Sequence, residues 1–220
     1  MNLYTARARA LATCLSALAG FVDAIAYIHL GGFFVSFMSG NTTRLGVGLA
    51  EGSSDAALAG GLLVTFVVGV ILGSLAGHLC TPRRQPAVLV LVAVLLASAA
   101  ALSLAGQPLL AAVAMALAMG AENAVFELNG EVRIGLTYMT GTLVKLGQKI
   151  TAALLGGDRL GWTPYLFLWM GLAAGGLAGA LTYARLGVGG LWIAAAVAGM
   201  LAFAAAKMGP DRREPDLDTV

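Results

Sequence analysis

Long apolar stretches separated by short polar breaks dominate the chain. Eight such segments can be drawn, and nearly all reach the ~17–25 residues that a membrane-spanning helix requires. Charged, glycine or proline residues end most of them. The pattern therefore predicts an all-α polytopic membrane protein. The segments cover residues 8–30, 33–50, 56–79, 87–104, 109–128, 134–155, 164–183 and 191–206.

A polar motif interrupts two of these segments at matching places. Residues 37–46, Phe-Met-Ser-Gly-Asn-Thr-Thr-Arg-Leu-Gly, align with residues 138–147, Tyr-Met-Thr-Gly-Thr-Leu-Val-Lys-Leu-Gly, at an offset of 101. Residues 20–24 recur as 120–124, and the glycine ladder Gly69/Gly73/Gly77 recurs as Gly171/Gly175/Gly179. Because the markers keep their order, we expect two copies of one unit, 1–105 and 106–207. The charged tail, 208–220, is expected to be disordered and cytoplasmic.

The distribution of basic residues bears on whether the motif segments cross the membrane. Cytoplasmic loops are enriched in Lys and Arg. If all eight segments span, the ten basic residues outside the motif segments divide six to four. If the motif segments are re-entrant, nine share one side and only Arg185 lies opposite. This favours six transmembrane helices as two inverted three-helix repeats, each with a re-entrant or broken segment and with both termini cytoplasmic. An extended run followed by a half-helix is still long enough to span, so that alternative stays open.

Composition agrees with a membrane location and excludes several classes of function. Hydrophobic residues make up 59% of the chain and charged residues 11%, against about 25% charged in soluble domains. A net charge of +2 argues against a nucleic-acid partner. No metal-ligand spacing, nucleophile motif or phosphate-binding loop is present, so we expect no enzyme, metal or cofactor. Residues 17–19 resemble a signal-peptide cleavage site, but the apolar run continues past them and recurs in the second copy.

Each motif is predicted to be a short extended run, at 33–37 and 134–138, followed by a half-helix. Ser and Thr are favoured N-caps, so the half-helices are expected to begin just after Ser39 and Thr140. Free N–H groups and the helix dipole at such a start suit an anion or a polar group. Two starts facing each other predict a solute site near the membrane midplane. The residues expected to bind the solute are Ser39, Gly40, Asn41, Thr42, Arg44, Thr140, Gly141, Thr142 and Lys145. The structural alternative is that Ser39 and Thr140 only cap helices, while the two cations extend to the interface.

A polar stripe along the first span suggests coupling to a proton or ion. Residues 16, 20, 23 and 27 fall on one helical face of the first span. The equivalent span of the second copy, residues 109–128, also carries polar residues. Ionisable groups inside a membrane usually face a cavity or a partner. A carboxylate here can pair with Arg44 or Lys145, or can carry a proton; a static ion pair is the structural alternative. The predicted coupling residues are Asp23, Tyr27, Glu122 and Asn123. The glycine ladders predict close helix packing, within the chain or in a homodimer.

The stretch Gly20-Phe21-Val22-Asp23-Ala24, together with Phe-Met-Ser-Gly-Asn-Thr-Thr at 37–43, resembles the YoaK family of small bacterial inner-membrane proteins. That family has no known function, so the resemblance implies only a multi-pass protein of the plasma membrane. Two broken segments in inverted repeats are similar in layout to sulfate-permease and uracil-permease transporters. We therefore expect a secondary transporter of a small polar or anionic solute. The alternatives are a passive channel and a non-transporting membrane binding or assembly protein.

Overall fold

A computed structural model describes residues 5–128, 131–132 and 135–208. Within these residues the apolar segments form eight α-helices, as the hydrophobic pattern predicted. Ile134 and the tail from residue 209 onward lie outside the described residues. The elements are α1 (Ala6–His29), α2 (Met38–Glu51), α3 (Asp55–Leu79), α4 (Arg84–Leu104), α5 (Pro108–Glu122), the 3-10 helix η1 (Asn123–Phe126), β1 (Glu127–Leu128), β2 (Glu131–Val132), α6 (Met139–Leu154), α7 (Thr163–Leu186), the 3-10 helix η2 (Gly187–Gly190) and α8 (Leu191–Met208).

Five stretches of the described chain are long and apolar enough to cross a membrane. They are 6–29, 55–79, 84–104, 108–126 and 163–207, and the last contains both α7 and α8. Helices α2 and α6 are not among them. With 14 and 16 residues they measure about 21 and 24 Å at ~1.5 Å per residue. Neither alone matches a hydrocarbon core of ~30 Å.

Large apolar side chains cover much of the outer surface. Val64, Val67, Ile71 and Leu75 on α3, and Phe203 on α8, are all more than half exposed. An exposed apolar surface of this extent is costly in water and is typical of helices that face lipid. The chain is therefore a polytopic membrane protein.

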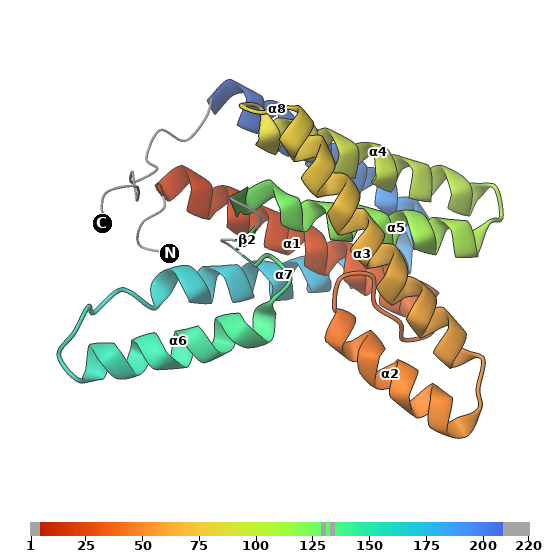
Figure 1. Ribbon diagram of the computed structural model, residues 1–220, viewed down its shortest axis with the longest axis horizontal. Coiled ribbons are helices and arrows are strands. Elements are labelled where there is room, and N and C mark those ends of the chain that lie inside the picture. The colour runs from red at the N-terminus through yellow and green to blue at the C-terminus, as the bar shows by residue number, and fades with distance from the viewer. Residues whose placement is uncertain (1–4, 129–130, 133–134, 209–220) are drawn as a thin grey trace.

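Helices α1 and α5 lie between the other long helices and are the most buried of the candidate spans (Figure 1). They run in opposite directions: α1 begins at the end of the molecule where α5 finishes. Helix α1 packs along α7, and α5 packs along α3 and α4. The first span of each sequence copy thus contacts the third helix of the other copy.

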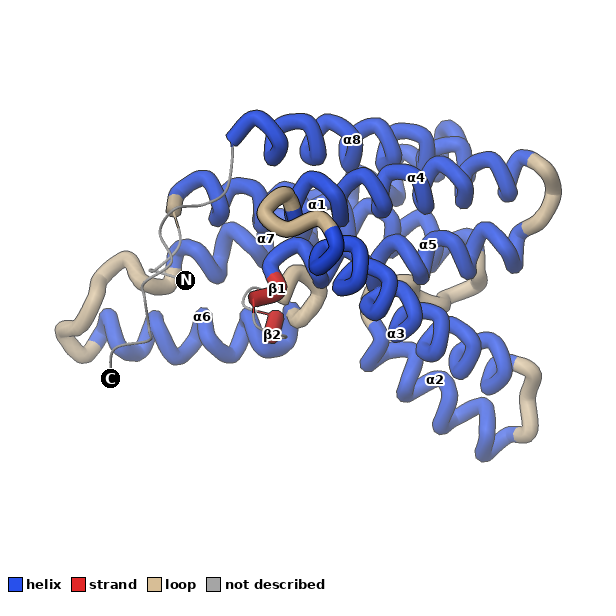
Figure 2. Tube along the Cα trace, turned by 45° about the horizontal axis from the view of Figure 1, so that its top comes forward, coloured by secondary structure: helices blue, strands red, loops and turns tan. Residues whose placement is uncertain are grey.

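The half-helices α2 and α6 begin near the centre of the molecule and run outward in opposite directions (Figures 1 and 2). Helix α2 leaves toward the end where α1 finishes, and α6 leaves toward the end where α5 finishes. Before each half-helix the chain must turn back toward the centre. After α1 this turn uses Gly31 and Gly32, with φ angles of 68° and 98°, a region that glycine enters at little cost.

The glycine ladder of α3 is a contact surface within the chain. Gly69 and Gly73 face the backbone of Leu117 and Ala121 on α5. A Cβ atom on Gly73 would lie only 2.6 Å from the carbonyl oxygen of Ala121. Small residues let two helix backbones approach this closely. The packing role predicted for the ladder is confirmed, and the partner helix belongs to the same chain.

The ladder of α7 packs on α1 in the same manner. Gly175 and Gly179 face the backbone of Ala17 and Phe21. Ala17 in the first copy corresponds to Leu117 in the second. Gly175 contacts Ala17 and Gly69 contacts Leu117, so Gly175 is the equivalent of Gly69, at an offset of 106 residues. The sequence alignment placed the ladders at an offset of 102 and was one helical turn wrong. The connection from α6 to α7, residues 155–162, is longer than that from α2 to α3, residues 52–54, which shifts the register.

Candidate functional site

A cavity of about 440 Å³ lies between the starts of α2 and α6. Two short stretches of chain line it, one from each copy of the motif, and Phe66 of α3 completes the wall. Most of these residues form pairs at the repeat offset of 101: Ser36 with Thr137, Phe37 with Tyr138, Met38 with Met139, and Ser39 with Thr140. Gly141 also lines the cavity. The structure therefore brings the two halves of the chain together at equivalent positions.

Both half-helices begin earlier than the sequence predicted. Helix α2 starts at Met38 and α6 at Met139, and neither has a side-chain N-cap. The carbonyl oxygen of Phe37 already accepts hydrogen bonds from Gly40 and Asn41 at 3.1 and 3.4 Å. Helical geometry is thus established before Gly40, so the prediction that Ser39 and Thr140 cap helices starting at Gly40 and Gly141 was wrong.

Three residues of the cavity lining have a backbone N–H group that the described chain leaves unpaired in the first helical turn. Those of Ser39, Thr140 and Gly141 have no hydrogen-bond partner within the described residues. The N–H groups of Met38 and Met139, in contrast, donate to Ser36 and Thr137 at 3.0 and 2.9 Å. Unsatisfied donors in the first helical turn are suited to a solute oxygen or an anion.

Asp23 on α1 fixes the turn that precedes α2. Its Oδ1 atom accepts hydrogen bonds from the N–H groups of Val35 and Ser36, both at 2.8 Å. Its Oδ2 atom accepts a bond from the Ser36 hydroxyl at 2.6 Å. The carboxylate satisfies backbone groups that would otherwise be unpaired inside the membrane. Asp23 pairs with this turn rather than with Arg44 or Lys145.

Asn123 occupies the equivalent position beside the second motif. Its Oδ1 atom accepts a hydrogen bond from the Thr137 hydroxyl at 3.2 Å, and its Nδ2 atom donates to the carbonyl oxygen of Met119 at 2.9 Å. This hydroxyl contact links η1, directly after α5, to the turn before α6. Of the four predicted coupling residues, Asp23 and Asn123 contact the cavity lining through Ser36 and Thr137.

Asn41 and Gly40 shape the first motif without lining the cavity. The buried Asn41 side chain donates to the carbonyl oxygen of Phe34 at 2.6 Å and accepts from its N–H at 3.0 Å. A Cβ atom at Gly40 would lie 2.7 Å from Phe37 and 2.9 Å from Phe34. These two residues therefore hold the non-helical run against α2.

The other predicted binding residues also lie off the cavity wall. The hydroxyls of Thr42 and Thr142 donate to carbonyl oxygens of their own helices. The Arg44 guanidinium lies 4.3 Å from the Phe33 ring centroid and 3.8 Å from the Asp55 carboxylate. Lys145 is exposed on α6. Because the helix starts at Met38, residue 44 lies about 9 Å further along its axis at ~1.5 Å per residue.

The two remaining stripe residues have different surroundings. Tyr27 is 45% exposed and its ring lies 5.0 Å from that of Phe34. Glu122 is completely buried, and neither carboxyl oxygen has a hydrogen-bond partner in the described part of the chain. Ser36 and Thr137 line the cavity but were not predicted as site residues. The sequence repeat could have identified them, because each precedes its predicted cap by three residues and the two positions are 101 residues apart.

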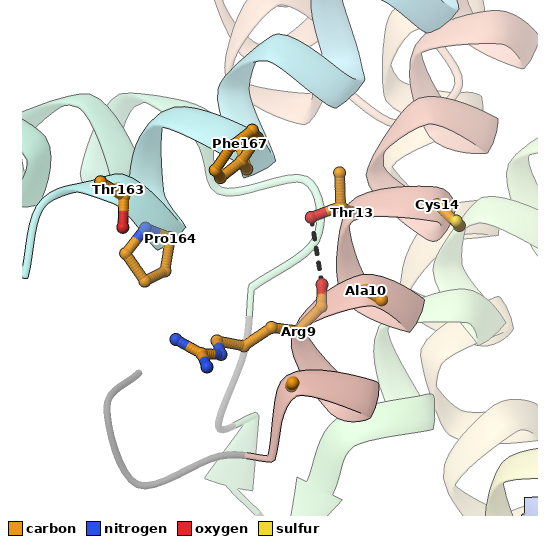
Figure 3. A pocket seen from close by; sticks show the side chains of 8 residues that line it. Arg9, Ala10, Thr13, Cys14, Thr163, Pro164 and Phe167 are labelled. Carbon is orange, nitrogen blue, oxygen red and sulfur yellow. Dashed lines mark hydrogen bonds between the residues drawn. The ribbon is translucent and has the colours of Figure 1, made fainter. Parts of the chain in front are cut away.

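A second cavity of about 500 Å³ opens at the beginnings of α1 and α7 (Figure 3). The Arg9 side chain extends toward Thr163 and Pro164, and the Thr13 hydroxyl donates to the carbonyl oxygen of Arg9 at 3.0 Å. None of its lining residues comes from the repeated motifs. Among the described residues, no three His, Cys, Asp or Glu side chains are grouped as metal ligands.

Comparison with known proteins gives a family for this architecture. A family model described as "Protein of unknown function (DUF1275)" matches residues 11–204. The chain belongs to this family. It is 41% identical over 197 residues to the UPF0700 transmembrane protein RA0705 of Rhizobium meliloti (strain 1021), covering 89% of this chain and 85% of the relative. It is 31% identical over 153 residues to the UPF0700 transmembrane protein YoaK of Bacillus subtilis (strain 168). The match covers 66% of this chain and 68% of the relative.

These relatives confirm the resemblance to the YoaK family and the transmembrane character of the chain. They are named for neither an activity nor a solute, so they supply no residue roles. No solved structure matches the chain. The similarity in layout to sulfate and uracil permeases is therefore without support from the comparisons.

Proposed function

We propose that this DUF1275 member is a secondary transporter of a small polar or anionic solute in the bacterial inner membrane. The observation that carries the proposal is the central cavity, whose walls are four equivalent residue pairs from two half-helix starts. Unpaired backbone N–H groups and five side chains with a hydroxyl group supply polar contacts within an apolar wall. Such a site at the junction of two repeats is a recurrent plan among transporters.

The proposed architecture has six membrane spans: α1, α3, α4, α5, α7 and α8. Two inverted repeats account for the opposite directions of α1 and α5 and for the exchanged contacts of α1 with α7 and of α5 with α3. Helices α2 and α6 are then re-entrant half-helices that meet near the midplane. Alternating access would follow from movement of one repeat against the other around the cavity.

The proposed orientation places both termini in the cytoplasm. The start of α1, the α3–α4 connection, the α6–α7 connection and the end of α8 share one end of the molecule (Figure 1). These element ends carry Arg7, Arg9, Arg83, Arg84, Arg159 and Lys207, while Arg185 lies near the opposite end of α7. An excess of basic residues is typical of the cytoplasmic side.

Gly141→Val is expected to weaken solute binding without unfolding the protein. Gly141 lines the cavity, so a larger side chain reduces the space for a solute, and a Cβ atom at Gly141 meets nothing within 4 Å. Binding can be measured as thermal stabilisation of the purified protein by a panel of inorganic anions, carboxylates, amino acids and nucleobases. For a solute that stabilises the wild type, we expect an affinity at least about tenfold weaker in the variant, or ~1.4 kcal/mol.

Gly147→Val provides the matched control, because Gly147 is also exposed on α6 with nothing within 4 Å but lies off the cavity wall. It should bind the same solute with wild-type affinity. If no member of the panel stabilises the wild type, or if Gly141→Val binds as tightly as Gly147→Val, the motifs serve only to hold helices together. Flux that does not saturate with solute concentration would indicate a passive channel instead.

A further inference from the structure

Glu122 is a buried acidic group that the fold does not use. It is the last residue of α5, with an exposed fraction of 0%, and both carboxyl oxygens lack a hydrogen-bond partner in the described chain. Buried polar groups in native proteins are nearly always paired, so a fully buried and unpaired carboxyl group requires an explanation.

Glu122 makes no hydrogen bond to the motif beside it within the described residues, and a different residue holds each motif. In the first repeat, Asp23 makes the contacts that fix the turn before α2. In the second, the neutral Asn123 makes the equivalent contact to Thr137. The residue before Asp23 is the buried, apolar Val22, whereas the residue before Asn123 is Glu122. The second repeat therefore carries an acid in addition to its anchoring residue.

No cation among the described residues compensates this acid. The ionisable group on α1 that interacts with it is Asp23, which is another acid rather than a cation. From α4, Arg84 is held by the Glu127 carboxylate at 2.8 Å and by the carbonyl oxygen of Ala124 at 3.2 Å. Helix α3 presents Gly73 to the neighbouring Ala121. An ionised carboxylate with no donor and no cation is strongly disfavoured in a buried site.

We propose that Glu122 is the proton-binding residue of this transporter. In the conformation described here the carboxyl group holds a proton. When the Thr137–Asn123 contact opens and water reaches α5, the O–H bond of the carboxyl breaks, the proton passes to water and a carboxylate remains. Proton binding at Glu122 from one side and release to the other would couple a proton gradient to solute movement. This role rests on the proposed transport function, because coupling needs a transported solute.

Infrared spectroscopy of the purified protein in lipid vesicles tests the assignment without a solute. The wild type should show the C=O stretch of a neutral carboxyl, shifted in deuterium oxide and in protein labelled with carbon-13 glutamate. The band should be lost entirely in Glu122→Gln and should convert to a carboxylate signal as the pH is raised. Glu127→Gln, which alters an acid already paired with Arg84 and Ser74, should retain it.

Isotope labelling keeps the test valid if Glu122→Gln does not fold, because the glutamate shift is read in the wild-type chain. A wild type without a neutral glutamate band overturns the proposal. So does a band that persists unchanged up to the pH at which the protein unfolds, since such an acid releases no proton. If the band behaves as expected while Gly141→Val binds solute normally, the central cavity is wrong as the solute site and the proton-binding role of Glu122 stands.

Discussion

Gly175→Leu is expected to lower the thermal unfolding midpoint in detergent by roughly 6–12 °C, which corresponds to about 3 kcal/mol in a chain of this size. A Cβ atom at Gly175 would collide with the backbone of Ala17, and backbone cannot move aside as a flexible side chain can. Helices α1 and α7 must therefore separate, and their interface is among the most extensive of the fold. The measurement is a thermal denaturation curve of purified protein.

Gly61→Leu is the control, because Gly61 is a helical glycine of α3 and a Cβ atom added there would meet nothing within 4 Å. It should unfold within about 2 °C of the wild type, as expected for surface substitutions of about 0.5 kcal/mol. Equal midpoints for Gly175→Leu and Gly61→Leu would contradict the close α1–α7 contact.

Asp23→Ala is expected to destabilise the protein by about 3 kcal/mol, because each buried donor that loses its acceptor costs about 1–3 kcal/mol. The substitution leaves the N–H groups of Val35 and Ser36 and the hydroxyl of Ser36 without their acceptor. No other acceptor for these three groups is present among the described residues. The free energy of unfolding can be measured by titration with sodium dodecyl sulfate in mixed micelles.

Asp23→Asn should retain more than half of the stability lost in Asp23→Ala. An amide keeps one acceptor oxygen for the two N–H groups, and asparagine already serves at the equivalent Asn123. If the alanine and asparagine variants are equally destabilised, the negative charge rather than the hydrogen bonding of Asp23 holds the turn. If neither is destabilised, the contact with residues 35 and 36 is unimportant for the fold.

Much of the fold was predictable because apolar patterning dictates where membrane helices form. The predicted segment 56–79 became α3 at 55–79, and 191–206 became α8 at 191–208. The glycine ladders and the repeated motifs were equally visible, since small residues and polar residues are rare enough in such segments to be recognised. The sequence therefore indicated which parts of the chain would meet.

The details of the candidate site depended on contacts distant in sequence. Ser39 has the local preference of an N-cap, but Asp23 from α1 and the side chain of Asn41 already fix the turn before α2. That tertiary pairing starts the helix at Met38 and moves Arg44 away from the cavity. Local capping preferences cannot anticipate an acceptor supplied by another helix, and for the same reason the roles of Ser36 and Thr137 were missed.

The central claim is that the two motifs enclose a solvent-accessible cavity open in turn to each side of the membrane. It is tested most directly by thiol labelling of Thr140→Cys in a chain whose exposed Cys14 and Cys80 are replaced by serine. A charged, membrane-impermeant methanethiosulfonate should label residue 140 from either face of sealed, oriented vesicles. Ser54→Cys, exposed in the connection between α2 and α3, should be labelled from one face alone. Absence of labelling at residue 140 from both faces, with Ser54→Cys still reactive, would contradict the account and identify the motifs as closed packing elements.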